Sequence, residues 1–114
     1  MTEAPPRLAA GVLVSALLRR ASAEGGFGVV LRRGDDRAGG IVIETAHAGR
    51  AGAILERGTD LDGREIWRIV GDGADAEATN IARVKRLRAD PDAWVIELDI
   101  ADAERFAAET LAAN

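Results

Sequence analysis

The sequence lacks cysteine and tyrosine altogether, and it contains a single histidine and two tryptophans. Without cysteine the chain has no disulfide, no thiolate nucleophile and no cysteine-ligated metal site. The one histidine, His47, is the sole candidate base for a catalytic triad, and any metal site would depend almost entirely on carboxylates. We therefore expect neither a metal nor a cofactor. A cysteine-free chain also fits the reducing cytoplasm.

Long hydrophobic runs are missing too. The most apolar stretch, LAAGVLVSALL at 8–18, is too short to cross a bilayer. The preceding MTEAPPR carries an acid and two prolines where a secretion signal carries basic residues, and Arg19-Arg20 follow the apolar run instead of preceding it. This order predicts a cytoplasmic protein without a membrane partner.

Positive charge is in the minority, because 15 Lys and Arg residues stand against 19 Asp and Glu, for a net charge of −4. No general attraction to nucleic acid is expected from this balance. One dense basic patch, ARVKRLR at 82–88, has no aromatic residues beside it for base stacking. We interpret it as a solvated helix face, and weak nucleic-acid binding through helix 81–88 is the third functional hypothesis.

The 114 residues, 47% of them hydrophobic, predict one globular domain over 1–114. Apolar residues at helical spacing predict three helices. The first follows Pro5 and Pro6 and ends before Gly25-Gly26, the second begins at Asp72 or Asp75, and the third begins at Asp102. The predicted helices cover 7–24, 75–89 and 102–112.

Alternating β-rich runs predict five strands, at 27–32, 41–45, 51–57, 64–70 and 93–100. The first four are joined by short polar turns, which suggests an antiparallel meander. The predicted fold class is α+β: a mainly antiparallel sheet of about five strands with helices packed on one face, in the order α-β-β-β-β-α-β-α. Two sets of side chains are expected to face the core, in addition to Trp67 and Trp94: Phe27, Val29 and Leu31 in the first strand, and Ala78, Ile81, Val84 and Leu87 in the second helix.

Two segments, RRGDDRAGG at 32–40 and DPDAW at 90–94, concentrate arginine, aspartate and glycine. Glycine and aspartate permit chain reversal, so the first segment is predicted to be a turn and not an adhesion signal built on Arg33-Gly34-Asp35. On the expected register Arg33 faces the core side and needs a carboxylate partner. The prediction is a turn closed by an arginine–aspartate bridge. The candidate binding residues are Arg32, Arg33, Asp35, Asp36, Asp90, Asp92 and Trp94.

These motifs also carry a resemblance. The helix ending in Arg19-Arg20, the stretch FGVVLRRGDDRAGGIVI and the later DPDAWVIELDI together resemble the small, mostly alphaproteobacterial family called domain of unknown function 1491. The resemblance extends from Arg7 to about Ile100. That family has no established activity, so the resemblance implies no catalytic residue.

Three functional hypotheses remain open. Few residues are suited to acid–base catalysis, which favours a small non-enzymatic protein that binds another protein or itself. The alternative is an enzyme, or an enzyme subunit, that uses the arginine and aspartate side chains of 32–36 and 90–92; the third is the nucleic-acid binder named above. A homodimer is one form of the first hypothesis, because Val30, Val42 and Ile54 on the second sheet face need cover from helices or from a second copy.

Overall fold

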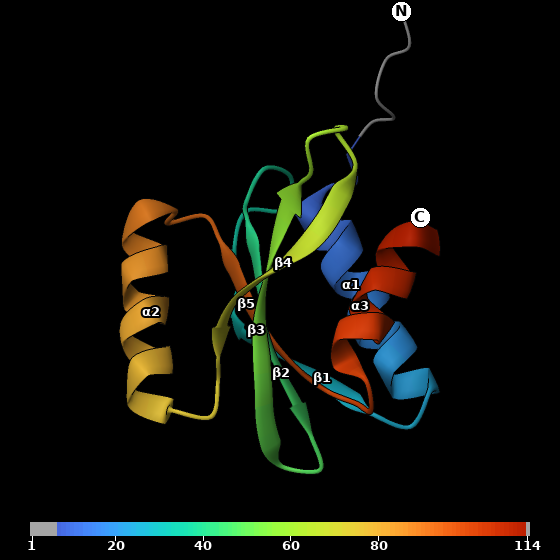
Figure 1. Ribbon diagram of the computed structural model, residues 1–114. Helices are drawn as coiled ribbons and strands as arrows, with labels where there is room; N and C mark the ends of the chain where they lie inside the picture. The colour runs from blue at the N-terminus through green and yellow to red at the C-terminus, as the bar shows by residue number, and fades with distance from the viewer. Residues whose placement is uncertain (1–6, 114) are drawn as a thin grey trace, which may run out of the picture.

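The computed structural model describes residues 7–113 and contains three helices and five strands in that range (Figure 1). Pro5 and Pro6, which were expected to precede the first helix, lie outside the described residues. Along the chain the elements are α1 (Ala10–Ala23), β1 (Phe27–Arg32), β2 (Ile41–His47), β3 (Arg50–Thr59), β4 (Glu65–Asp72), α2 (Ala76–Ala89), β5 (Trp94–Asp99) and α3 (Ala103–Ala113).

The five strands form one mixed sheet in the order β1-β5-β2-β3-β4. β5 pairs antiparallel with β1 and parallel with β2, with Ile43 opposite Ile96 in the parallel ladder. The expectation of a mainly antiparallel meander is therefore wrong. The last strand enters between the first two, and β1 and β2 do not form a hairpin.

The central place of β5 follows from its composition. Trp94, Val95 and Ile96 are consecutive and all buried, so this strand needs cover on both faces. The segment 33–40 between β1 and β2 is long enough to pass across the start of β5. It is tied there by the Trp94 amide, which donates a hydrogen bond of 2.7 Å to the Gly40 carbonyl.

Helices cover both faces of the sheet, so the prediction that they pack on one face is also wrong (Figure 1). α1 and α3 lie together on one side and enclose the larger core, which includes Leu17, Ile96 and Phe106. α2 lies on the other side, where Leu87 packs against Val42, Ile54 and Val95. The second face is thus covered by a helix of the same chain.

α2 is loosely held. Asp75 caps its start, because the carboxylate accepts a hydrogen bond of 3.0 Å from the Ala78 amide. No residue of this helix is fully buried, and Ile81 and Val84 are exposed. The expectation that both face the core is wrong: α2 is joined to the sheet by ion pairs from Arg83 and Arg86 and by the apolar packing of Leu87.

Among residues 7–113, one charged side chain is buried. Arg57 of β3 is buried and is satisfied by Glu65 at 2.6 Å and by the Leu8 carbonyl at 2.8 Å. Burial lowers the pKa of Arg57 below its ordinary value, and the neighbouring charge of Arg7 lowers it further, while Glu65 opposes both effects. Within residues 7–113, no helix has the length and apolar character needed to cross a membrane.

Candidate functional site

The two segments singled out from the sequence lie against each other at the start of β5. The Asp35 amide donates to the Asp92 carbonyl at 2.8 Å, and the Trp94 indole Nε1 donates to the Asp35 carbonyl at 2.7 Å. Glycine makes this approach possible: a Cβ on Gly34 or Gly39 would lie 2.2 or 2.0 Å from the Asp92 carbonyl oxygen. The structure therefore joins 33–40 and 90–94 into one backbone cluster, which we call the loop cluster.

Two carboxylates of the loop cluster are engaged with backbone amides. Asp35 accepts hydrogen bonds from the amides of Arg37 at 3.0 Å and Ala38 at 2.8 Å, and these bonds lower its pKa. Asp90 accepts from the amides of Gly40 and Asp92, each at 3.0 Å. These contacts are those of turns, in which the side chain replaces a backbone acceptor.

The two arginines differ from the expected arrangement. Arg33 pairs with Asp36 at 3.2 Å, but its side chain is 73% exposed, and its guanidinium lies over the Trp94 ring, 5.5 Å from the centroid. The expectation that it faces the core is wrong, because a β-bulge between Val30 and Arg32 breaks the alternation. Arg32 instead reaches inward and donates to the Ala93 carbonyl at 2.9 Å.

The loop cluster thus brings together all seven candidate residues, Arg32, Arg33, Asp35, Asp36, Asp90, Asp92 and Trp94. Its polar groups hold two loops and the start of a strand together. No hydrogen bond in it joins a potential nucleophile to a base within the described residues. The arrangement can fix the crossing of 33–40 over β5.

β1 is the feature that the sequence did not reveal. It lies at the edge of the sheet and pairs only with β5. In the described part of the chain, the backbone hydrogen bonds outside regular helices and strands involve none of its six residues, so its outer edge is open. Its apolar side chains are also exposed: Phe27 by 52%, Val29 by 42%, Val30 by 39% and Leu31 by 45%.

Local packing explains this exposure. Phe27 and Val29 lie opposite Asp99 and Glu97, on the sheet face that carries α2, but α2 does not reach this edge. On the other face, Gly28 lets Leu18 of α1 approach so closely that a Cβ would lie 2.3 Å from its methyl group. The prediction that Phe27, Val29 and Leu31 face the core is wrong. The side chains of β1 do alternate between the two faces of the sheet, but the strand lies beyond the part of the sheet that α2 covers.

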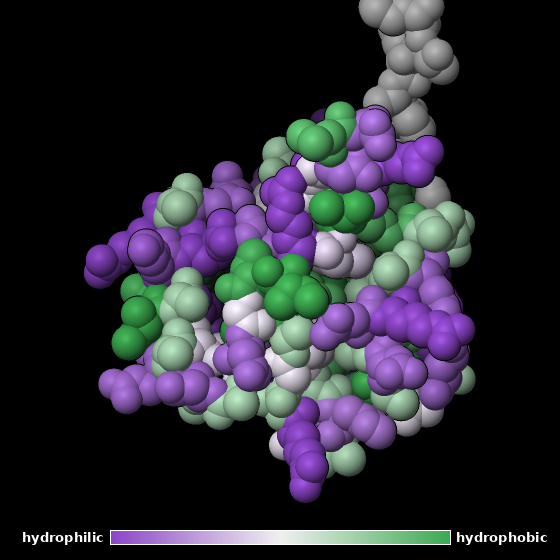
Figure 2. Space-filling model, viewed as in Figure 1, coloured by the Kyte–Doolittle hydropathy of each residue, from purple (hydrophilic) through white to green (hydrophobic). Residues whose placement is uncertain are grey.

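Other exposed apolar side chains are scattered. Figure 2 shows separate hydrophobic patches over β4 and on α2, where Ile69, Val70, Ile81 and Val84 are exposed. Charged residues interrupt both elements. Single exposed apolar residues are common on protein surfaces, whereas four within five positions on an open strand edge are not.

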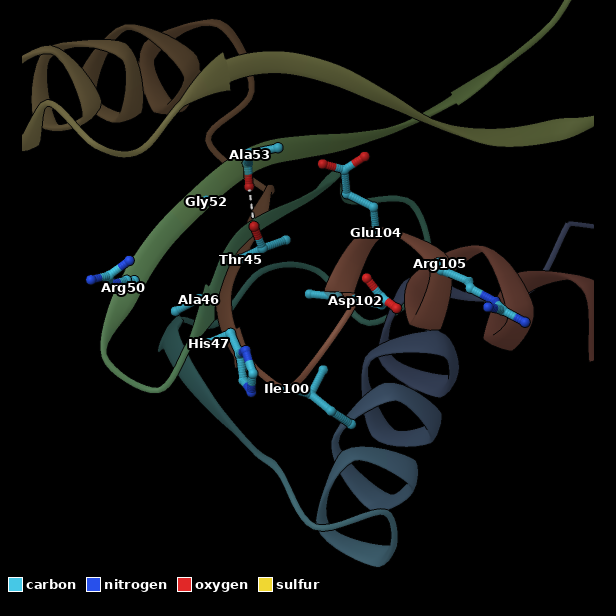
Figure 3. Close-up of a pocket in the computed structure, with 11 residues that line it drawn as sticks. Thr45, Ala46, His47, Arg50, Gly52, Ala53, Ile100, Asp102, Glu104 and Arg105 are labelled. Atoms are coloured by element: carbon cyan, nitrogen blue, oxygen red, sulfur yellow. Dashed lines mark hydrogen bonds between the residues drawn. The ribbon is translucent and has the colours of Figure 1, made fainter.

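A shallow pocket of about 450 Å³ opens at the carboxyl ends of the parallel strands β2 and β5, where ligands often bind in α/β sheets (Figure 3). His47 and Thr45 come from β2, and Asp102 and Glu104 from the start of α3. Asp102 has a positive φ of 49°. The carboxyl-end position depends on strand pairing, so it could not be predicted from the sequence.

The chemistry of this pocket is limited. The Thr45 hydroxyl donates to the Ala53 carbonyl at 2.6 Å, so its proton is already in use. Figure 3 shows His47 and Asp102 on opposite walls, and no hydrogen bond joins them. Within residues 7–113, no group of three histidine or carboxylate side chains is arranged to hold a metal ion. His47 is exposed at the end of β2.

Half of the cations on the basic helix face are paired with carboxylates of the sheet. Arg83 binds Glu44 through two hydrogen bonds of 2.6 and 2.8 Å, and the bond to Glu44 raises the pKa of Arg83. Arg86 pairs with Glu56. Two of the four cations on 83–88 are therefore bound to carboxylates of β2 and β3, which weakens the potential that phosphates would meet.

Comparison with solved structures shows the same fold in proteins of alphaproteobacteria. The crystal structure of a DUF1491 family protein from Caulobacter crescentus matches with a TM-score of 0.76 and 29% identity, over 88% of this chain and 94% of that chain. The NMR structure of a DUF1491 family protein from the same organism gives 0.74 and 30%, over 90% and 94%. A solution structure of a protein from A. tumefaciens gives 0.68 and 27%, over 85% and 89%.

Among curated proteins, none matches this sequence. A family model described as "Protein of unknown function (DUF1491)" matches residues 8–108, which is most of the chain. The relatives' names state no ligand, partner or reaction. On the extent of this match, the chain belongs to the DUF1491 family.

Proposed function

We propose that the protein is a small cytoplasmic binding protein without catalysis of its own, and that the outer edge of β1 takes up a β-strand from a protein partner. The observation that supports this is the open edge of β1 with its four exposed apolar side chains. Backbone groups on such an edge give affinity to an added strand, and the side chains on either face give selectivity. The absence of cysteine fits the cytoplasm.

The enzymatic alternative draws no support from the loop cluster. The carboxylates of Asp35 and Asp90 are occupied by backbone amides, and Asp36 is paired with Arg33. A catalytic carboxylate or guanidinium needs a free face toward a substrate. We therefore do not propose a reaction for the segments 32–36 and 90–92.

The experiment is a pull-down from the native cells with three tagged forms of the chain. Val29→Lys places a charge at the centre of the open edge, whereas Ile81→Lys makes the same change at an exposed site on α2. We expect partners recovered by the wild type and by Ile81→Lys to be lost with Val29→Lys. Circular dichroism checks that all three are folded. Equal recovery by both variants would contradict a binding site at β1.

A further inference from the structure

We infer that the partner at this edge is a second copy of the chain, with the two β1 strands antiparallel about a two-fold axis. The two five-stranded sheets would then form one continuous sheet. This inference rests on the proposed function, because it names the occupant of the same edge. The outer N–H and C=O groups of β1, which no backbone group of residues 7–113 satisfies, would pair across the axis.

In this arrangement the apolar side chains of β1 in one copy lie beside those of β1 in the other copy. An axis through Val29 brings the two Val29 residues together and sets Phe27 of each copy beside Leu31 of the other. These side chains are about half exposed in the single chain. Aromatic–aliphatic pairs across neighbouring antiparallel strands are stabilising, so each exposed side chain gains an apolar neighbour.

The charges at the two ends of β1 select the antiparallel direction. Glu24, which pairs with Arg20 at 3.2 Å, stands just before the strand with its side chain 48% exposed, and Arg33, which pairs with Asp36, stands just after it. Antiparallel pairing puts the Glu24 end of one copy beside the Arg33 end of the other, so opposite charges meet at both ends. A parallel arrangement would bring like charges together. A two-fold interface of this kind closes on itself and forms a dimer.

The opposite edge of the sheet is unsuited to the same pairing. β4 begins with Glu65 and ends with Asp72. Antiparallel pairing of two β4 strands would set these carboxylates against each other, and like charges across strands are destabilising. β4 also carries Arg68 at its middle. Charge is a common protection of an edge strand, and β1 has no charged residue before Arg32.

Sedimentation velocity on the full chain tests the inference. We expect the wild type and Ile81→Lys to be dimers at about 100 μM, in the range of micromolar association. Val29→Lys is expected to raise the dissociation constant at least about tenfold, because two lysines would meet on the axis. Circular dichroism confirms that the variants remain folded.

A charge exchange tests the direction of pairing. Glu24→Arg alone and Arg33→Glu alone are each expected to weaken the dimer, and the double variant to restore much of it. A merely structural role of either residue would not produce this rescue. Weakening in both single variants without rescue would overturn the antiparallel register.

The outcomes separate this inference from the proposed function. A wild type that is monomeric at 100 μM but still binds another protein through β1 would overturn the inference and leave the proposed function standing. A dimer that Val29→Lys does not weaken would place self-association on another surface and would also overturn the inference. A monomer with no β1-dependent partner in the pull-down would contradict both.

Discussion

At the scale of single residues, Arg33 shows how exposure limits what an ion pair contributes. Its guanidinium pairs with Asp36 and lies over the Trp94 ring, but both partners of the ion pair are largely in solvent. Exposed pairs contribute up to about 1 kcal/mol, and an exposed cation–π contact a similar amount. We expect Arg33→Ala to lower the free energy of unfolding by about 1 kcal/mol, measured by urea denaturation. A loss of several kcal/mol would mean that the pair is buried in solution.

Arg57 is the opposite case, because it is buried with a single carboxylate partner, Glu65. Removing one partner of a buried pair leaves an uncompensated charge, at a cost of about 3–5 kcal/mol. We expect Glu65→Ala to lose about 3 kcal/mol in urea denaturation. Glu109→Ala is the matched control: it breaks the exposed pair with Arg105 and is expected to lose about 0.5 kcal/mol or less. Equal losses would contradict the burial of Arg57.

The ionisation of Asp35 makes the contribution of the loop cluster to stability depend on pH. Its backbone hydrogen bonds to Ala38 and Arg37 lower its pKa in the folded state. A carboxyl whose pKa is lowered by folding stabilises the protein above its unfolded pKa of about 3.9, and this contribution is lost as pH falls through the lower folded pKa. We expect unfolding experiments to show Asp35→Asn less stable than the wild type at pH 7, with the difference shrinking below about pH 4. A difference independent of pH would argue against the charged hydrogen bonds.

At the scale of elements, β5 is deeply buried and α2 is largely exposed. Ile96 of β5 is fully buried between β1 and β2, whereas Ile81 of α2 is exposed. A buried isoleucine changed to alanine loses about 2–5 kcal/mol, and an exposed one about 0.5 kcal/mol or less. We expect Ile96→Ala and Ile81→Ala to differ accordingly in chemical denaturation. Similar losses would mean that α2 packs more tightly in solution than its exposure indicates.

At the scale of the whole molecule, α3 closes the larger core. Phe106 and Ala107 are buried against the sheet and α1, and the Ala107 carbonyl accepts the Trp67 indole N–H at 3.0 Å. A chain ending at Ile100 would expose this apolar surface and leave the indole without its partner. We expect it to lose the cooperative thermal transition that differential scanning calorimetry should show for the full chain. A chain ending at Ala112 is the control and is expected to keep it.

The position of α2 removes the first reason for expecting a homodimer and moves the candidate surface to β1. Val42 and Ile54, which were expected to need a second copy or a helix, are covered by Leu87 of α2. The original reason for a homodimer on that face is therefore removed. Within residues 7–113, the apolar side chains of β1 remain without cover, because α2 sits over β2, β3 and β5 and stops short of this edge.

By itself, the sequence determined the local structure and the family. Periodicity, the Asp75 cap and the Gly25 turn placed the elements, because these depend on residues within a few positions of each other. The motifs RRGDDRAGG and DPDAW indicated both the family and a turn built from arginine, aspartate and glycine. The sequence thus pointed to both segments of the loop cluster, although the residues that contact each other there lie about sixty positions apart in the chain.

Tertiary structure alone decided which strands pair and which faces are covered. The insertion of β5 between β1 and β2 depends on burial of this strand on both faces, and the bulge after Val30 turns Arg33 to solvent. Neither follows from alternation, which fixes the two faces of a strand but not what covers them. For the same reason Phe27 and Val29 read as core residues in the sequence and prove to be the exposed edge, because a strand's neighbours come from distant parts of the chain.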